Sequence, residues 1–212
     1  MNASYSTTHP LRLGWQALKT LYEDLFVFAL LSLLTWVSAL SVVLFFPGVA
    51  ALFEMARRAL EGRAVSVGAW WEEVKGGGRR AWGVGLVSVF ITLVLISNVV
   101  FYARLEASLW RYLAVLWLWL LLIWGMSLPY VWAFNVLLTD PRLGLVLRNA
   151  IYLVFLRPFH AVVAVLLLSS LAAISVIFPL FLLILPAYVA LYATLLARQL
   201  VVDLQRRHRV DD

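Results

Sequence analysis

The chain has 212 residues, of which 64% are hydrophobic and only 13% are charged, whereas soluble domains are about half apolar and about a quarter charged. So little charge cannot cover the surface of a water-soluble globule, which excludes a soluble enzyme. The net charge of +6 does not indicate nucleic-acid binding, because the basic residues lie between apolar stretches, where they orient membrane proteins and contact anionic lipid. Cysteine is absent, so disulfides and thiolate sites are excluded. We predict an all-α, polytopic transmembrane helix bundle forming a single membrane domain over residues 1–212.

The predicted bundle has about five spans, because five stretches that are uncharged, apart from Arg198 near the end of the last one, are long enough to cross about 30 Å of hydrocarbon. They cover residues 25–46, 81–102, 112–133, 159–176 and 179–199. The last two belong to one uncharged stretch, 159–197, which we divide at a tight turn within 175–179. The first stretch also resembles a secretory signal with a faint cleavage site at Val37-Ser38-Ala39, but its long polar lead and its apolar continuation favour a retained helix.

Amphipathic segments connect these spans. Three of them, at 49–61, 66–75 and 141–156, are expected to lie at the cytoplasmic membrane surface. Ser66 and Asp140-Pro141 are the expected starts of the second and third segments. Before the first span, Leu11, Trp15, Leu18 and Tyr22 recur at helical spacing, which predicts either an early start of the first helix or an interfacial helix.

Basic residues are distributed unevenly over the two membrane faces that five crossings would create. Only Arg12, Lys19, Arg104 and Arg111 fall on the face of the N-terminal segment, and all other basic residues fall on the long loops and the tail. The positive-inside rule therefore predicts a multi-pass protein of the bacterial plasma (inner) membrane, with the N-terminus outside and the C-terminus cytoplasmic.

Three short motifs share a proline, an alanine four residues later and an aromatic residue soon after. They begin at Pro47, Pro129 and Pro186, which are also the candidate helix bends. One interpretation is a parallel helix-loop-helix unit used twice and followed by a final helix. The other is chance, because prolines often mark the ends of membrane helices.

Catalytic chemistry is not expected. The interiors of the predicted spans contain no carboxylate, histidine or arginine, which ion-coupled transport generally needs. Three scattered histidines cannot build a metal site or a catalytic triad. We therefore expect no catalytic residue, no metal and no cofactor, with His160 as an interfacial anchor. Asn98 and Asn135 are the candidate intramembrane polar contacts, either between helices or to a polar solute.

Paired basic and aromatic residues on the predicted cytoplasmic side form the candidate interface. These residues are Arg57, Arg58, Trp70, Trp71, Arg79 and Arg80. The expected partners are a bilayer with anionic head groups and either a transporter subunit or further copies of this chain, with no nucleic acid. Glu72, Glu73 and Lys75 are expected to form a solvated face.

The stretch 47–83 resembles the YesL-like family of bacterial integral membrane proteins, whose domain has no assigned biochemical function. The resembling features are Ala51-Leu52-Phe53, Leu60-Glu61-Gly62, Trp70-Trp71, Lys75 and Gly83, with Arg148-Asn149-Ala150 in a second stretch at 143–162. The chain departs from the family in having alanine and valine where the first helix end often has threonine, and in its Gly76 to Gly78 run. The resemblance implies a partner role near carbohydrate uptake and carries over no catalytic residues.

The sequence leads to two functional hypotheses. The first is an accessory or regulatory membrane component associated with carbohydrate uptake, since the polar, structured segments are concentrated on one face. The alternative is a permease, or a permease subunit, for a small neutral solute, using proline-bent helices and the side chains of Asn98 and Asn135.

Overall fold

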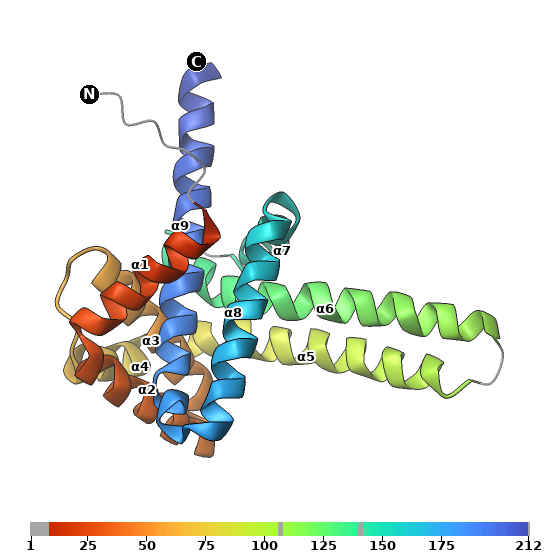
Figure 1. Cartoon of the computed structure of the whole chain (residues 1–212), viewed down its shortest axis with the longest axis horizontal. Helices are drawn as coiled ribbons and strands as arrows, with labels where there is room; N and C mark the ends of the chain where they lie inside the picture. Colours follow the sequence, from red (N-terminus) through yellow and green to blue (C-terminus); the bar gives the residue numbers. More distant parts are fainter. Residues whose placement is uncertain (1–8, 106–107, 140–141, 212) are drawn as a thin grey trace.

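The computed structural model describes residues 9–105, 108–139 and 142–211, and every regular element in these ranges is helical, as predicted. The elements are α1 (Pro10–Glu23), α2 (Leu25–Leu40), α3 (Phe45–Leu60), α4 (Val67–Gly76), α5 (Gly78–Ala103), α6 (Ser108–Leu137), α7 (Leu143–Leu156), α8 (Pro158–Ile177), the 3₁₀-helix η1 (Pro179–Leu183) and α9 (Leu185–Asp211). A body of helices surrounds α9, and the α5–α6 hairpin projects from it (Figure 1).

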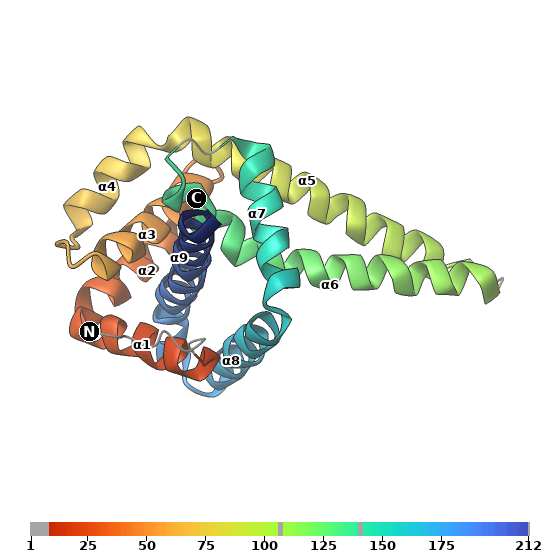
Figure 2. The same cartoon turned by 90° about the horizontal axis from the view of Figure 1, so that it is seen from above.

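Helix α9 is the central helix of the body. It packs against α1, α2, α3, α6, α7 and α8, and Figure 2 shows these helices arranged around it. Nearly all side chains from 187 to 197 are buried. The predicted span 179–199 is therefore η1 followed by a helix that is covered by protein instead of lipid.

The three proline motifs mark the three helices that meet in the core, because α3, α6 and α9 pack against one another. Ala51, Ala133 and Ala190, four residues after each proline, are all 0% exposed. Alanine at such positions lets helix backbones approach closely.

Two of the three candidate bends lie at helix starts. Pro47 is in the first turn of α3 and Pro186 is the second residue of α9, where a missing N–H breaks no helical hydrogen bond. Only Pro129 lies inside a helix, α6. Prolines 47 and 186 therefore begin helices and do not bend them.

The predicted span 25–46 is not one continuous helix. Helix α2 ends at Leu40, Ser41 has extended backbone dihedrals of φ −102° and ψ 110°, and α3 begins at Phe45. At its other end, α2 is bent by 95° from α1, with the break at Asp24. The segment before residue 25 is therefore a helix of its own, α1, and not an early start of the first predicted span.

The remaining spans have the predicted positions. Helices α5, α6 and α8 contain residues 81–102, 112–133 and 159–176, and α8 ends inside the predicted turn at 175–179. Among the described residues, three helices could cross a membrane by length and composition, or four if α1 and α2 form one bent span. The structure thus has three or four candidate spans and does not confirm a fifth. Figures 1 and 2 show that α5 and α6 run crosswise to α8 and α9.

The three predicted amphipathic segments agree with the structure to different degrees. Helix α4 begins after Ser66, whose hydroxyl accepts a hydrogen bond from the Ala69 N–H at 3.2 Å, as the N-cap prediction required. Helix α7 begins at Leu143, and the predicted start at Asp140 and Pro141 lies outside the described residues. In α3, residues 50–56 are all buried, so this half of the helix is core and is not exposed at a membrane surface.

We expect Gly85→Ala to destabilise the fold. A Cβ at position 85 would overlap the ring of Phe46, and that ring is held between Trp82, at a centroid distance of 5.0 Å, and Trp132, at 6.3 Å. Overpacking of this kind costs about 1–3 kcal/mol. Thermal unfolding in detergent measures the effect.

Gly83→Ala is the matched control on the same helix, because its Cβ would have an ordinary contact of 3.9 Å with the Leu143 side chain. Alanine there should be neutral or stabilise α5 by up to about 1 kcal/mol. Equal thermal stabilities for the two variants would contradict the close packing of α5 on Phe46.

Candidate functional site

The candidate interface residues gather at one end of the body, around Glu54. Helical spacing places Arg57 and Arg58 three and four residues after this carboxylate, on the same face of α3. Arg57 donates from Nη2 and Nε to the two oxygens of Glu54 at 2.6 and 2.8 Å, and Arg58 donates from Nε at 3.0 Å. Such forked, charge-assisted bonds are stronger than neutral ones. Glu54 is 7% exposed and therefore anchors both arginines.

The two arginines set the protonation state of Glu54. Burial alone would raise the pKa of its carboxyl group, but hydrogen bonds and the positive charges of Arg57 and Arg58 outweigh burial, so the pKa is lowered from 4.5. The bond to Glu54 in turn raises the pKa of Arg57. Glu54 is consequently ionised at neutral pH.

Further carboxylates complete this cluster. Glu61 accepts from Nη1 of Arg57 at 2.7 Å, and Glu73 of α4 lies 3.9 Å from Nη2 of Arg58. Both guanidinium groups are thus engaged within the protein, which leaves little of their charge for lipid head groups. We call Glu54, Arg57, Arg58, Glu61 and Glu73 the polar cluster.

Two long-range bonds extend the polar cluster across the body. Nε of Arg80, at the start of α5, donates to Oδ1 of buried Asn135, near the end of α6, at 2.8 Å. Nη1 of Arg198 on α9 donates to the carbonyl oxygen of Leu60, at the end of α3, at 2.9 Å. The structure therefore joins two residues that the sequence placed in separate groups, Arg80 and Asn135, while Arg79 stays exposed.

The tryptophan pair is divided between the core and the surface. Trp70 is 4% exposed and Trp71 is 45% exposed, with their rings stacked at a centroid distance of 6.3 Å. Trp70 packs in the core next to Gly48. Of the pair, only Trp71 is available for a lipid or a partner.

Asn98 does not connect two helices. Its Nδ2 donates to the carbonyl oxygen of Val94, one turn earlier in α5, at 2.8 Å. Besides the bond from Arg80 to Asn135, α5 and α6 are joined by Trp124, whose indole N–H donates to the hydroxyl of Thr92 at 2.9 Å. Sequence reasoning missed this pair, although Thr92 is a polar residue inside a predicted span.

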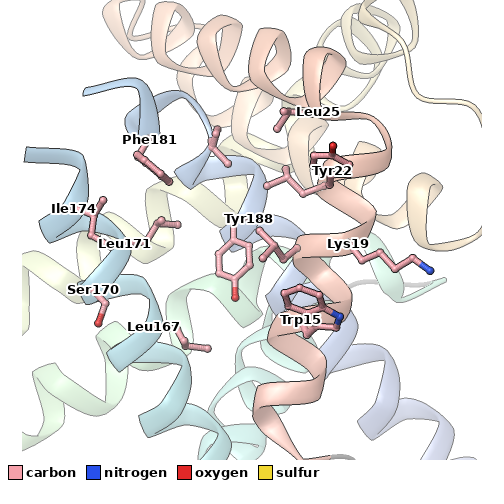
Figure 3. A pocket seen from close by; sticks show the side chains of 13 residues that line it. Trp15, Lys19, Tyr22, Leu25, Leu167, Ser170, Leu171, Ile174, Phe181 and Tyr188 are labelled. Carbon is pink, nitrogen blue, oxygen red and sulfur yellow. The ribbon is translucent and has the colours of Figure 1, made fainter. Parts of the chain in front are cut away.

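An apolar groove of about 630 Å³ opens on another side of the body, between α1 and α8. Figure 3 shows Trp15, Lys19 and Tyr22 on one wall, Leu171 on the other, and Tyr188 of α9 between the walls. The sequence contained one signal for this groove, because its lining residues Trp15, Leu18 and Tyr22 belong to the row noted above at helical spacing. It contained no signal that α8 would form the opposite wall.

Among the described residues, no group of three histidine, aspartate or glutamate side chains could hold a metal ion. In comparisons with known proteins, no family model, no curated protein and no solved structure matches this chain. The YesL-like resemblance therefore stays a prediction from the motifs, and the arguments for function rest on the structure.

Glu54→Gln should destabilise the folded protein by about 2 kcal/mol or more, because a neutral amide removes the buried carboxylate that both arginines share and leaves Arg57 with Glu61 and Arg58 with the more distant Glu73. The pH dependence should change as well. The pKa of Glu54 is lower in the folded state than its ordinary value of 4.5. As the pH falls, the Glu54 carboxylate is therefore protonated in the unfolded chain before it is protonated in the folded protein. The stabilisation is complete above about pH 4.5 and is lost as the pH falls toward the folded-state pKa.

Chemical unfolding in detergent between pH 3 and pH 7 tests this expectation. Glu72→Gln is the control, because Glu72 is exposed and its 2.7 Å pair with Lys75 is a surface pair, worth about 0–1 kcal/mol. If the two glutamine variants have the same pH profile, Glu54 is not the anchor of the polar cluster.

Proposed function

We propose that this chain is an accessory membrane component that acts by associating with another membrane protein, and not by catalysis or transport. The observation that carries the proposal is the direction of the α5–α6 hairpin, which runs crosswise to the helices of the body (Figures 1 and 2). Both helices are long and apolar enough to cross a membrane. Because the hairpin and α8 run crosswise, a flat bilayer that α8 crosses cannot also be crossed by the hairpin. If α8 crosses the membrane, the apolar surface of the hairpin must be covered by another component.

The surface of the hairpin supports this proposal. Large apolar side chains are exposed along both helices, including Phe90 at 67% on α5 and Trp119 at 62% on α6. Exposed apolar surfaces of this extent mark contacts with lipid or protein. The hairpin is held together by the bond between Trp124 and Thr92, which makes it a stable docking element.

The permease alternative loses the residues on which it depended. The amide of Asn98 is bonded to its own helix, and Asn135 is buried and bonded to Arg80. The groove between α1 and α8 is lined almost wholly by apolar side chains and opens at the side of the body. None of these arrangements offers a polar path for a small neutral solute.

The topology is also part of the proposal. We infer a cytoplasmic C-terminus from the distribution of basic residues, and the bonds of Arg198 to Leu60 and of Arg80 to Asn135 support it, because they join segments predicted to share that face. The five-crossing prediction with an outside N-terminus has less support. His9 packs against Phe159, at the predicted cytoplasmic start of α8, with ring centroids 6.2 Å apart.

The class of partner follows from the family resemblance alone. The YesL-like resemblance supports a partner from a carbohydrate-uptake system. The arrangement of the hairpin requires only that the partner be embedded in the membrane and offer an apolar surface. A second copy of this chain would also satisfy that requirement.

Photo-crosslinking in native membranes tests the proposal. With p-benzoylphenylalanine at Phe90 or Trp119, we expect a crosslinked membrane protein, identified by mass spectrometry. Tyr152 on α7, which is exposed but outside the hairpin, is the control position and should give much less of that product. Crosslinks to lipid alone from both hairpin positions would refute the proposal.

Purified protein in proteoliposomes tests the alternative directly. We expect no saturable uptake of neutral sugars, and no difference between the wild type and Asn98→Leu. Saturable uptake that the Asn98→Leu variant abolishes would instead establish the permease function.

A further inference from the structure

The groove between α1 and α8 is formed by two helices that separate from a common point. Near their N-terminal ends, His9 and Phe159 are in edge-on ring contact. From there the two helices diverge, as Figures 1 and 3 show. Tyr188, Ile184 and Phe181 close the space from behind. The result is a wedge that is open along its outer side.

The lining of this groove indicates the chemistry of its occupant. Aliphatic and aromatic side chains make up almost the whole wall, and the exceptions are Ser170 and Lys19, with no acidic side chain among the lining residues. A volume of about 630 Å³ lies within the range of roughly 300–1,000 Å³ found for ligand sites. A long aliphatic chain fits such a wall, whereas a polar solute would leave its hydrogen-bonding groups unpaired.

The outer face of α1 has the character of a membrane interface. Arg12, Trp15, Lys19 and Tyr22 follow one another at successive turns, and all four are exposed. Cations together with tryptophan and tyrosine are typical of helices that lie at the head-group level. The bend of 95° between α1 and α2 allows α1 to lie along the membrane surface while α2 enters it.

Lys19 connects that face to the groove. Its aliphatic stem lines the wall, and its ammonium group lies at the outer edge, directed away from the groove in Figure 3. Its nearest carboxylate is Glu23 at 3.9 Å, and both side chains are well exposed, so this surface pair is weak. An anionic head group at the same edge would meet two cations, Arg12 and Lys19.

The end of the body at the foot of the groove contains no charge. Residues 25–53 and 159–197 carry no charged side chain, and the turns in both stretches lie together, because the indole N–H of Trp36 donates to the carbonyl oxygen of Leu182 at 2.9 Å. Leu40, Val176 and Ile177 are strongly exposed there. Such a surface is suited to hydrocarbon, and insertion of this end into a membrane would place lipid tails beside the groove.

We propose that this groove binds an acyl chain of an anionic membrane phospholipid, with the phosphate of that lipid beside Lys19 and Arg12. The lipid comes from the surrounding bilayer, since the groove opens beside α8, one of the candidate spans. The inference rests on membrane insertion, which is part of the proposed function. It does not depend on a protein partner at the α5–α6 hairpin.

Adjacent serines on α8 provide a matched pair of variants. Ser169 and Ser170 are both exposed, but only Ser170 lines the groove. A phenylalanine at 170 fills part of the wedge, and displacing even two methylene groups of a bound chain lowers its affinity by about tenfold. Phenylalanine at 169 should change nothing.

The measurement is native mass spectrometry of protein released from nanodiscs of equal parts phosphatidylglycerol and phosphatidylcholine. We expect the wild type and Ser169→Phe to retain phosphatidylglycerol. The amount of phosphatidylglycerol retained by Ser170→Phe should be about tenfold lower. Equal retention by both phenylalanine variants would overturn the proposal. Circular dichroism is the folding control, and the two variants should be equally helical.

A second pair of variants tests the head group. Lys19→Gln should remove the preference for phosphatidylglycerol over phosphatidylcholine while a lipid is still retained, and Lys75→Gln, at another exposed and paired lysine, should not. An unchanged preference in Lys19→Gln would overturn the assignment of the phosphate. The same photo-crosslinker placed at Ser170 tests for a protein occupant. A crosslinked protein at this position, with no lipid retained, would overturn the proposal that the groove binds lipid and would not change the crosslinking result at the hairpin.

Discussion

The close packing of α3, α6 and α9 is the constraint on which the rest of the structure depends. Lipid tails are as apolar as leucine, so membrane helices gain little from burying apolar surface against one another and rely on close contact. Fully buried alanines at 51, 133 and 190 provide that contact. Because α3 lies in this core, Glu54 is buried as well, and its two arginines keep it ionised. The polar cluster is therefore a consequence of the core.

Features that depend only on residues close together in the sequence were predicted from the sequence. The boundaries of α5 and α8 follow from uncharged length, and the start of α4 follows from the Ser66 cap. The environment of a helix was not predictable in this way. The charged face of α3 suggested a membrane surface, yet Arg57 and Arg58 pair with Glu54 of the same helix. Likewise, an uncharged stretch has the same composition whether lipid or protein covers it, so the sequence did not predict that α9 would be enclosed by other helices.

The candidate site required tertiary structure for a similar reason. Arg80 and Asn135 are 55 residues apart, and each was identified alone because sequence analysis could evaluate only its local surroundings. The groove combines α1, near the start of the chain, with α8 and α9, near its end. One wall was visible as a row of apolar residues at helical spacing. The opposite wall depended on how α8 packs, which no local pattern reports.

The two ends of the body differ in a way that bears on its position in a membrane. One end carries the polar cluster, together with Arg198 bonded to Leu60. At the other end, the turns after α2 and α8 are uncharged and expose large aliphatic side chains. A segment that crosses a bilayer completely needs polar groups at both ends to meet both head-group layers. Among the described residues, the uncharged turns after α2 and α8 therefore lack the charged groups that would meet a second head-group layer at the end of a complete crossing.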